Sequence, residues 1–180
     1  MPVSINGSNE SYQGIWPAIW MLPNDPISEW PLRGEIDIAE LHGLNPNQAL
    51  ATLHFGNTIS VSDYQLIQQN PVYYDSNKSY GYYHRFGLEW NFDENNPYIA
   101  TWYDGKEVAH HQLNVAVPGK NYAIYKDVFK PGQELGYYLI LNIATGGNFG
   151  STTSRTSNGS GDSSNPLLQM KISSITAYQL

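Results

Sequence analysis

Three acidic side chains stand close together in one strand-like segment. Residues 34–40 read Gly-Glu-Ile-Asp-Ile-Ala-Glu. In an extended strand alternate side chains point to opposite faces, so Glu35 and Asp37 share one face and the isoleucines take the other. Strict alternation would place Glu40 with the isoleucines, but one extra residue in a β-bulge, expected at Ala39, returns it to the acidic face. The segment therefore predicts three carboxylates on one face of a strand.

The spacing of the two glutamates suits one kind of chemistry. Four effective strand steps put the Cα atoms of Glu35 and Glu40 about 13 Å apart. If both side chains lean inward, the carboxyl groups lie about 5–6 Å apart, as in retaining glycoside hydrolysis, where one carboxylate attacks the anomeric carbon and the other shuttles the proton. Asp37 would keep the acid/base protonated by like-charge coupling and could share a proton with the nucleophile. The alternative is an acidic strand face exposed to solvent.

Tryptophans upstream of the acidic segment favour a sugar-binding role for it. Trp16 and Trp20 are four residues apart in an apolar stretch, so both project to one face of a strand, and Trp30 follows. Sugar rings present flat C–H faces that stack on indole, and the indole N–H can also donate a hydrogen bond. Trp90 and Trp102 lie within periodic strand-like runs, and we expect them in the core.

The rest of the chain predicts the elements that position these residues. Short β-branched or aromatic runs alternate with period 2 and are separated by turn residues, as at 23–26 and 104–105. No capped window of ten or more residues has helical periodicity. The pattern predicts an all-β sandwich or barrel in a single domain, residues 1–180. The expected strands are 15–22, 35–41, 50–55, 82–90, 99–103, 137–143 and 171–178, with long polar loops at 57–80 and 150–165.

Composition excludes several other classes of protein. The 180 residues carry 9 Lys+Arg against 16 Asp+Glu, a formal net charge of −7, and such an acidic surface repels nucleic acid. No apolar run approaches the roughly 20 residues that span a bilayer, so no membrane partner is expected. The chain has no cysteine, which excludes disulfides, a thiolate nucleophile and Cys-ligated zinc.

Taken together, the motifs resemble glycoside hydrolase family 16. The matching runs are Ile-Trp-Pro-Ala-Ile-Trp-Met-Leu (15–22), Trp-Pro-x-x-Gly-Glu-Ile-Asp-Ile-Ala-Glu (30–40), Thr-Leu-His (52–54), Trp-Tyr-Asp-Gly (102–105) and Leu-Ile-Leu-Asn-Ile-Ala-Thr-Gly-Gly-Asn (139–148). The E-I-D-x-x-E form is similar to laminarinases (endo-β-1,3-glucanases), agarases and carrageenases rather than to lichenases. The resemblance covers nearly the whole chain. It implies a concanavalin-like jelly roll of two curved antiparallel sheets, with the catalytic strand on the concave side.

The resemblance also implies a role for each candidate residue. Glu35 would be the nucleophile, Asp37 the assisting carboxylate and Glu40 the acid/base. The substrate-binding residues would be Trp16, Trp20 and Trp30 on the non-reducing side of the cut, His54 near the acid/base, and Asn142 facing the groove. No cofactor is implied. No metal is predicted either, because Ser173 stands where many relatives have an Asp linked to a structural calcium.

Within family 16 the chain resembles the laminarinase branch, which implies endo-acting, retaining hydrolysis of β-1,3-glucan such as laminarin. The alternatives are the same chemistry on agarose, carrageenan or mixed-linkage β-glucan, a transglycosylase, and a non-catalytic β-glucan-binding protein. Proteins of that last kind commonly lack one or both catalytic glutamates. The expected partner is the polysaccharide, bound by a monomer, and secretion is expected because such polymers lie outside cells.

The start of the chain departs from the family pattern. Residues 1–5 lack the basic and apolar regions of a signal peptide. Family members usually have several strands ahead of the segment that corresponds to 15–22, so we expect a domain that is incomplete at its N-terminus. The alternative is a naturally trimmed domain.

Overall fold

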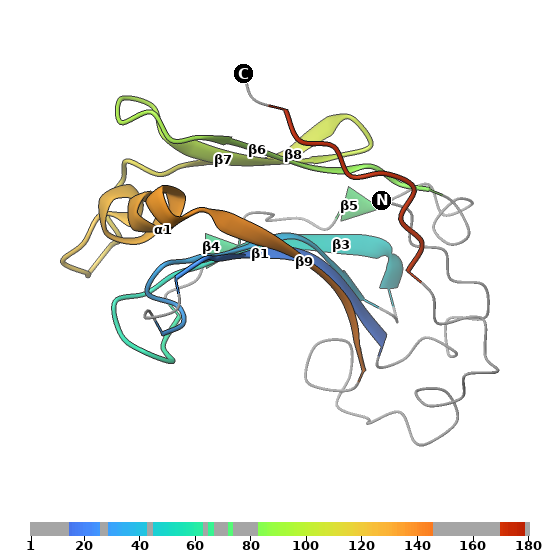
Figure 1. Ribbon diagram of the computed structural model, residues 1–180, viewed down its shortest axis with the longest axis horizontal. Helices are drawn as coiled ribbons and strands as arrows, with labels where there is room; N and C mark the ends of the chain where they lie inside the picture. Colours follow the sequence, from blue (N-terminus) through green and yellow to red (C-terminus); the bar gives the residue numbers. More distant parts are fainter. Residues whose placement is uncertain are drawn as a thin grey trace.

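Two antiparallel sheets face each other in the computed structural model, which describes residues 15–25, 29–42, 45–62, 65–66, 72–73, 83–145 and 170–178 (Figure 1). The larger sheet has the order β4-β3-β2-β1-β9, with β5 also paired to β3, and the smaller has the order β6-β7-β8. The elements are β1 (Ile15–Pro23), β2 (Glu35–His42), β3 (Asn45–His54), β4 (Gln65–Leu66), β5 (Val72–Tyr73), β6 (Phe86–Asn91), β7 (Tyr98–Tyr103), β8 (Lys106–Gln112), η2 (Tyr125–Phe129), α1 (Lys130–Leu135) and β9 (Tyr137–Thr145).

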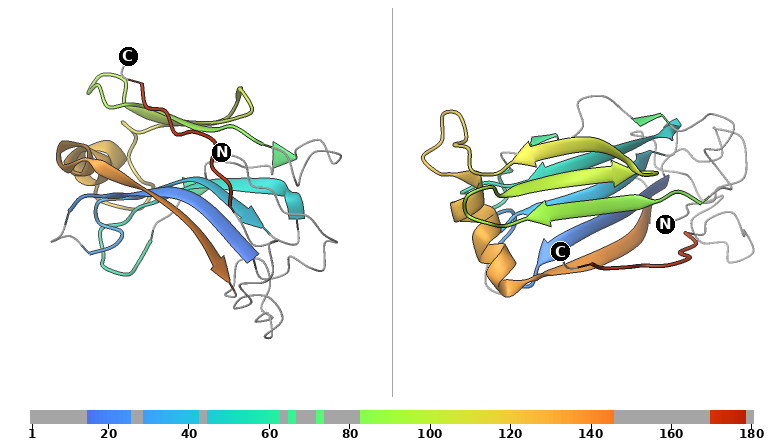
Figure 2. Two further views of the ribbon diagram at one scale, coloured as in Figure 1. Left: turned by 45° about the vertical axis from the view of Figure 1, so that its right-hand side comes forward. Right: turned by 90° about the horizontal axis from the view of Figure 1, so that it is seen from above.

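The predicted all-β jelly-roll class is confirmed by this arrangement. Figure 2 shows the strands of the smaller sheet lying over those of the larger one, as in an aligned sandwich. The larger sheet curves so that its concave side is turned away from the smaller sheet (Figure 1). Among the residues that the structure describes, no helix is long and apolar enough to cross a bilayer.

Several elements differ from the sequence prediction. Strand β8 was not predicted because its sequence, Lys-Glu-Val-Ala-His-His-Gln, is mostly polar and largely exposed. Conversely, residues 171–178 alternate like a strand but form none; their side chains are exposed, and no strand of the described part of the chain pairs with them. The predicted loop at 57–80 contains the short β4 and β5, and most of it lies outside the described residues, as does all of 150–165.

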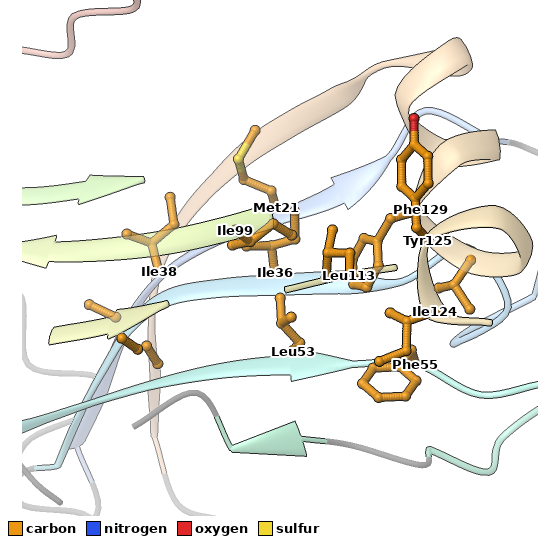
Figure 3. Packing of buried hydrophobic residues seen from close by; sticks show 14 of the residues in the cluster. Met21, Ile36, Ile38, Leu53, Phe55, Ile99, Leu113, Ile124, Tyr125 and Phe129 are labelled. Carbon is orange, nitrogen blue, oxygen red and sulfur yellow. The ribbon is translucent and has the colours of Figure 1, made fainter. Parts of the chain in front are cut away.

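A helical segment between β8 and β9 was also not predicted. The π-helix η2 continues directly into α1, neither has a side-chain cap, and α1 contains Pro131 and Gly132, so local helix signals are weak. Tyr125 and Phe129 are buried, and Figure 3 shows them at one end of the core beside Leu113. Tertiary packing rather than propensity therefore stabilises this segment.

Alternation along β2 builds the core on one side and leaves the other side free for the acids. Ile36 and Ile38 point between the sheets, where they belong to the same buried cluster as Ile99 of β7 and Leu53 of β3 (Figure 3). The acidic side chains of β2 consequently lie on the opposite face, which is the concave side of the larger sheet.

The β-bulge expected in β2 is present. The register against β1 passes from Asp37 directly to Ala39, which lies opposite Ile19, so Ile38 is the extra residue. The register against β3 shifts at the same place. The sequence placed the extra residue at Ala39, one position later. The bulge keeps both Ile38 and Ala39 buried, at 7% and 0% exposure, which period-2 alternation would not allow.

A residue of the smaller sheet hydrogen-bonds to the β-bulge of β2. The Tyr103 hydroxyl of β7 donates a hydrogen bond of 2.8 Å to the carbonyl oxygen of Ile38, the residue that the β1 register skips. Burial, followed by the nearby Glu40 and Asp37, raises the pKa of the Tyr103 phenol well above its usual range, so the phenol remains a donor. This bond links the core to the strand that carries the acids.

Trp90 was expected in the core, and this is wrong: its side chain is 43% exposed. It lies on β6, an edge of the smaller sheet as described, and its ring packs against Phe92 at 5.8 Å and Tyr137 at 6.2 Å. Trp102, on the central strand β7, is half-buried.

The bond from Tyr103 to Ile38 can be tested by removing a single oxygen. Tyr103→Phe leaves a buried carbonyl without this donor, so we expect the free energy of unfolding to fall by about 1–3 kcal/mol in urea denaturation. The matched control is Tyr98→Phe on the same strand, whose hydroxyl donates to Glu89 on the sheet surface. Its effect should be much smaller, and equal losses would show that the bulge does not depend on Tyr103.

Candidate active site

The structure brings the three acids of β2 together, as the sequence predicted. Donor atoms of Glu35, Asp37 and His54 all lie within 4.8 Å of one another. Glu40 is close enough that the charges of both Asp37 and Glu35 act on it. The bulge is what turns Glu40 towards the other two. Asp37, in the middle, is only 3% exposed although it lies on the outward face, so it forms the floor of the site.

Burial raises the pKa values of all three carboxyls. Desolvation, with the neighbouring Asp37 second, raises the pKa of Glu35 to about 7 and that of Glu40 to about 8. Desolvation also raises the pKa of Asp37 to about 7. Carboxyls of the cluster therefore hold protons near neutral pH, and a protonated carboxyl can act as a general acid.

Trp30 holds the Glu35 carboxyl directly. Its Nε1–H donates to Glu35 Oε2 at 2.6 Å, while its ring is 41% exposed. The turn between them needs glycine at Gly34, which has φ of +76° and where a Cβ would lie 2.6 Å from the Phe129 ring. Phe129 of the helical segment therefore restricts the turn that comes directly before Glu35. The exposed indole of Trp30, beside the carboxyl of Glu35, can stack on a sugar ring.

The other predicted tryptophans lie on β1, beside the acids. The Trp16 indole lies close enough to Glu40 to oppose the rise of its carboxyl pKa. Trp20 lies opposite Asp37 in the register of β1 and β2, and its Nε1–H donates to Asn142 Oδ1 on β9 at 2.7 Å. Asn142 is therefore on the concave face, as predicted, with its amide oriented by Trp20.

His54 connects the acids to a loop that the sequence did not single out. It ends β3 opposite Glu35, with its Nε2 3.2 Å from Asp37 Oδ2 and its ring 5.9 Å from that of Trp30. Its Nδ1 lies 3.2 Å from Ser62 Oγ. Ser62 had no signal of its own because it stands in a polar segment without periodicity, and only the return of the loop brings it to His54.

Glu35, Asp37 and His54 also have the donor types that could hold a cation. In this structure a Glu35 oxygen already accepts from Trp30, and an Asp37 oxygen faces His54. We therefore assign the cluster to acid–base chemistry and propose no metal.

The raised carboxyl pKa values predict how the free energy of unfolding depends on pH. Between pH 4.5 and about 8 the folded state holds a proton on Glu40 that the unfolded state has released, so stability falls as the pH rises through this window. Glu40→Gln should therefore raise the free energy of unfolding at pH 8 by about 2 kcal/mol, less than the whole shift because the site relaxes, and change it little at pH 4.5.

Urea denaturation at the two pH values measures this effect. The control is Glu107→Gln on β8, whose side chain is 42% exposed. A stabilisation by Glu40→Gln that is equal at both pH values would contradict the electrostatic explanation.

The chain is similar to several known proteins. A family model described as "XgeA-like, catalytic GH16 domain" matches residues 6–83. The chain is 34% identical over 147 residues to glucan endo-1,3-β-glucosidase A1 of Niallia circulans, covering 76% of this chain and 19% of that protein. It is 28% identical over 168 residues to endo-1,3-1,4-β-glycanase EglC of Rhizobium meliloti (strain 1021), covering 93% of this chain and 28% of that protein.

A solved structure gives the same result for the fold. The endo-β-1,3-glucanase of Pyrococcus furiosus superposes with a TM-score of 0.61 at 26% identity, over 86% of this chain and 52% of that one. The chain thus spans about half of this structure and less of the two curated relatives. The matched family model, the acidic strand and the two-sheet fold show that the chain belongs to glycoside hydrolase family 16.

Proposed function

We propose that this chain is an endo-acting, retaining β-1,3-glucanase that works by double displacement. The observation that carries the proposal is the placement of Glu35, Asp37 and Glu40 together on one concave strand face, where burial raises their pKa values. Two carboxyl groups that flank a bond, one protonated and one ionised, are what retaining hydrolysis requires. The tryptophans around them supply apolar surface for sugar rings.

In the first step, Glu40 donates its proton to the glycosidic oxygen while a carboxylate oxygen of Glu35 attacks the anomeric carbon. The bond from that carbon to the leaving oxygen breaks, and an ester bond to Glu35 forms. Trp30 donates to Glu35 and stabilises its charge before the attack. Asp37 hydrogen-bonds to Glu35, so it can hold the proton that Glu35 releases on ionising.

In the second step, the ionised Glu40 removes a proton from water, and the water oxygen attacks the same carbon. The ester bond to Glu35 breaks, the carboxylate is restored, and Glu40 is again protonated. Two inversions at one carbon give net retention. A sugar hydroxyl in place of water would give transglycosylation by the same route.

The choice of β-1,3-glucan as substrate rests on the relatives. One is named for endo-1,3 activity and another for endo-1,3-1,4 activity, so mixed-linkage β-glucan is the second candidate. A polymer of this kind is met outside the cell, which supports secretion of the protein. We propose that the protein acts as a monomer.

The decisive experiment is reducing-end release from laminarin by the chain and by its Glu35→Gln variant. We expect the variant to lose more than about a thousandfold in kcat, because the amide cannot form the ester intermediate, with laminarin affinity little changed. Glu107→Gln makes the same chemical change on the smaller sheet and should remain active.

Two further readouts sharpen this test. The first product detected by NMR should be the β-anomer, and an α-anomer would contradict retention. Barley β-glucan, agarose and carrageenan run in parallel decide the polymer. Binding of laminarin without cleavage by the parent chain would favour a β-glucan-binding protein instead.

A further inference from the structure

The two ring nitrogens of His54 face different partners, and this makes its tautomer matter. Nδ1 lies 3.2 Å from Ser62 Oγ, and Nε2 lies 3.2 Å from Asp37 Oδ2. A neutral imidazole carries one proton, so only one nitrogen donates. We propose that Ser62 is a positioning residue: its hydroxyl donates to Nδ1, which keeps the ring proton on Nε2, the nitrogen that faces Asp37 Oδ2.

The opposite arrangement is the rival. Nδ1–H would then donate to Ser62, and Nε2 would need a proton from Asp37 in order to avoid two lone pairs facing each other. That proton would be drawn away from the Glu35 side, where Asp37 and Glu35 are hydrogen-bonded to each other. With the proton on Nε2, Asp37 can accept from His54 through one oxygen and still share a proton with Glu35.

Burial of Asp37 favours the Nε2–H form. Asp37 Oδ2 is fully buried and has no hydrogen bond of good geometry from the described residues, and His54 Nε2 is within reach of it. A buried carboxylate oxygen that lacks a donor is costly, so the donor is best placed on the nitrogen that faces it.

The loop that carries Ser62 is held to the same turn that positions Glu35. The Ser60 N–H donates to the carbonyl oxygen of Trp30 at 2.9 Å. The loop is tight, since a Cβ added at Gly56 would lie 2.3 Å from the carbonyl oxygen of Val61. These contacts fix the position of Ser62 relative to Trp30. The loop thus helps to orient two side chains that contact the acids: His54 through Ser62, and Trp30 through Ser60.

The consequence for catalysis, which rests on the proposed function, is a change in the pH profile. His54 faces Asp37 and Glu35 on β2, and Glu40 lies farther along the same strand. When Asp37 loses its N–H donor, the pKa of its carboxyl rises, because the ionised form has lost a stabilising bond. The carboxylate pair then takes up a proton at higher pH, and the acid limb of kcat/KM moves to higher pH.

The first test reads the tautomer without using activity. Nitrogen-15 spectra of the His side chains, with His54 assigned from the His54→Gln variant, should show Nε2 protonated and Nδ1 unprotonated in the neutral ring. Ser62→Ala should shift this population towards Nδ1–H, and Ser62→Thr, which keeps the hydroxyl, should restore it. A protonated Nδ1 in the parent, or spectra unchanged in Ser62→Ala, would overturn the proposal.

The second test uses laminarin hydrolysis across pH. Ser62→Ala should lower kcat by about tenfold on the acid side, with KM little changed because Ser62 is not placed against substrate, and Ser62→Thr should recover most of the loss. Equal losses in the two variants would indicate a merely structural loop. If the parent cleaves no glucan, the proposed function fails, but the tautomer measurement still decides the role of Ser62.

Discussion

The β-bulge in β2 determines where the acidic side chains of the site lie. One extra residue must turn Glu40 to the face of Glu35 and Asp37 while both residues of the bulge stay buried. The carbonyl at the bulge is bonded by Tyr103 from the other sheet, so the packing of the two sheets and the spacing of the carboxyl groups are not independent. A change in the core beneath β2 would alter the distance between the two glutamates, and that distance decides the stereochemistry of glycoside hydrolysis.

Three carboxyls on one strand are tolerated because donors from several elements oppose their desolvation. Trp16 comes from β1, Trp30 from the turn before β2, and His54 from β3, and each lowers the pKa of at least one acid that burial has raised. These residues lower the carboxyl pKa values less than burial raises them. The site therefore keeps protons near neutral pH and carries less charge than its three acids suggest. Full compensation would ionise every carboxyl and leave no general acid.

The sequence predicts the parts of this protein whose signals are local. Strand β2 and its acids follow from alternation, and the tryptophans follow from the chemistry of sugar binding. Strand β8 has too few apolar residues to show a period, whereas 171–178 shows a period but pairs with no described strand. The helical segment forms because Phe129 packs against Gly34, and Ser62 reaches His54 through loop closure. Both depend on contacts between residues far apart in the sequence or around a turn, which no local pattern records.

The assignment of acid and nucleophile can be reasoned in two ways that do not share an assumption. The resemblance to family 16 gives Glu35 and Glu40 their roles by their position in a motif. The environment supports Glu35 as the nucleophile, because its carboxyl accepts the charge-stabilising bond from Trp30. Burial also raises the pKa values of both glutamates. A cluster that keeps protons near neutral pH favours the proposed hydrolysis over simple sugar binding, because binding alone would not need a proton donor at the site.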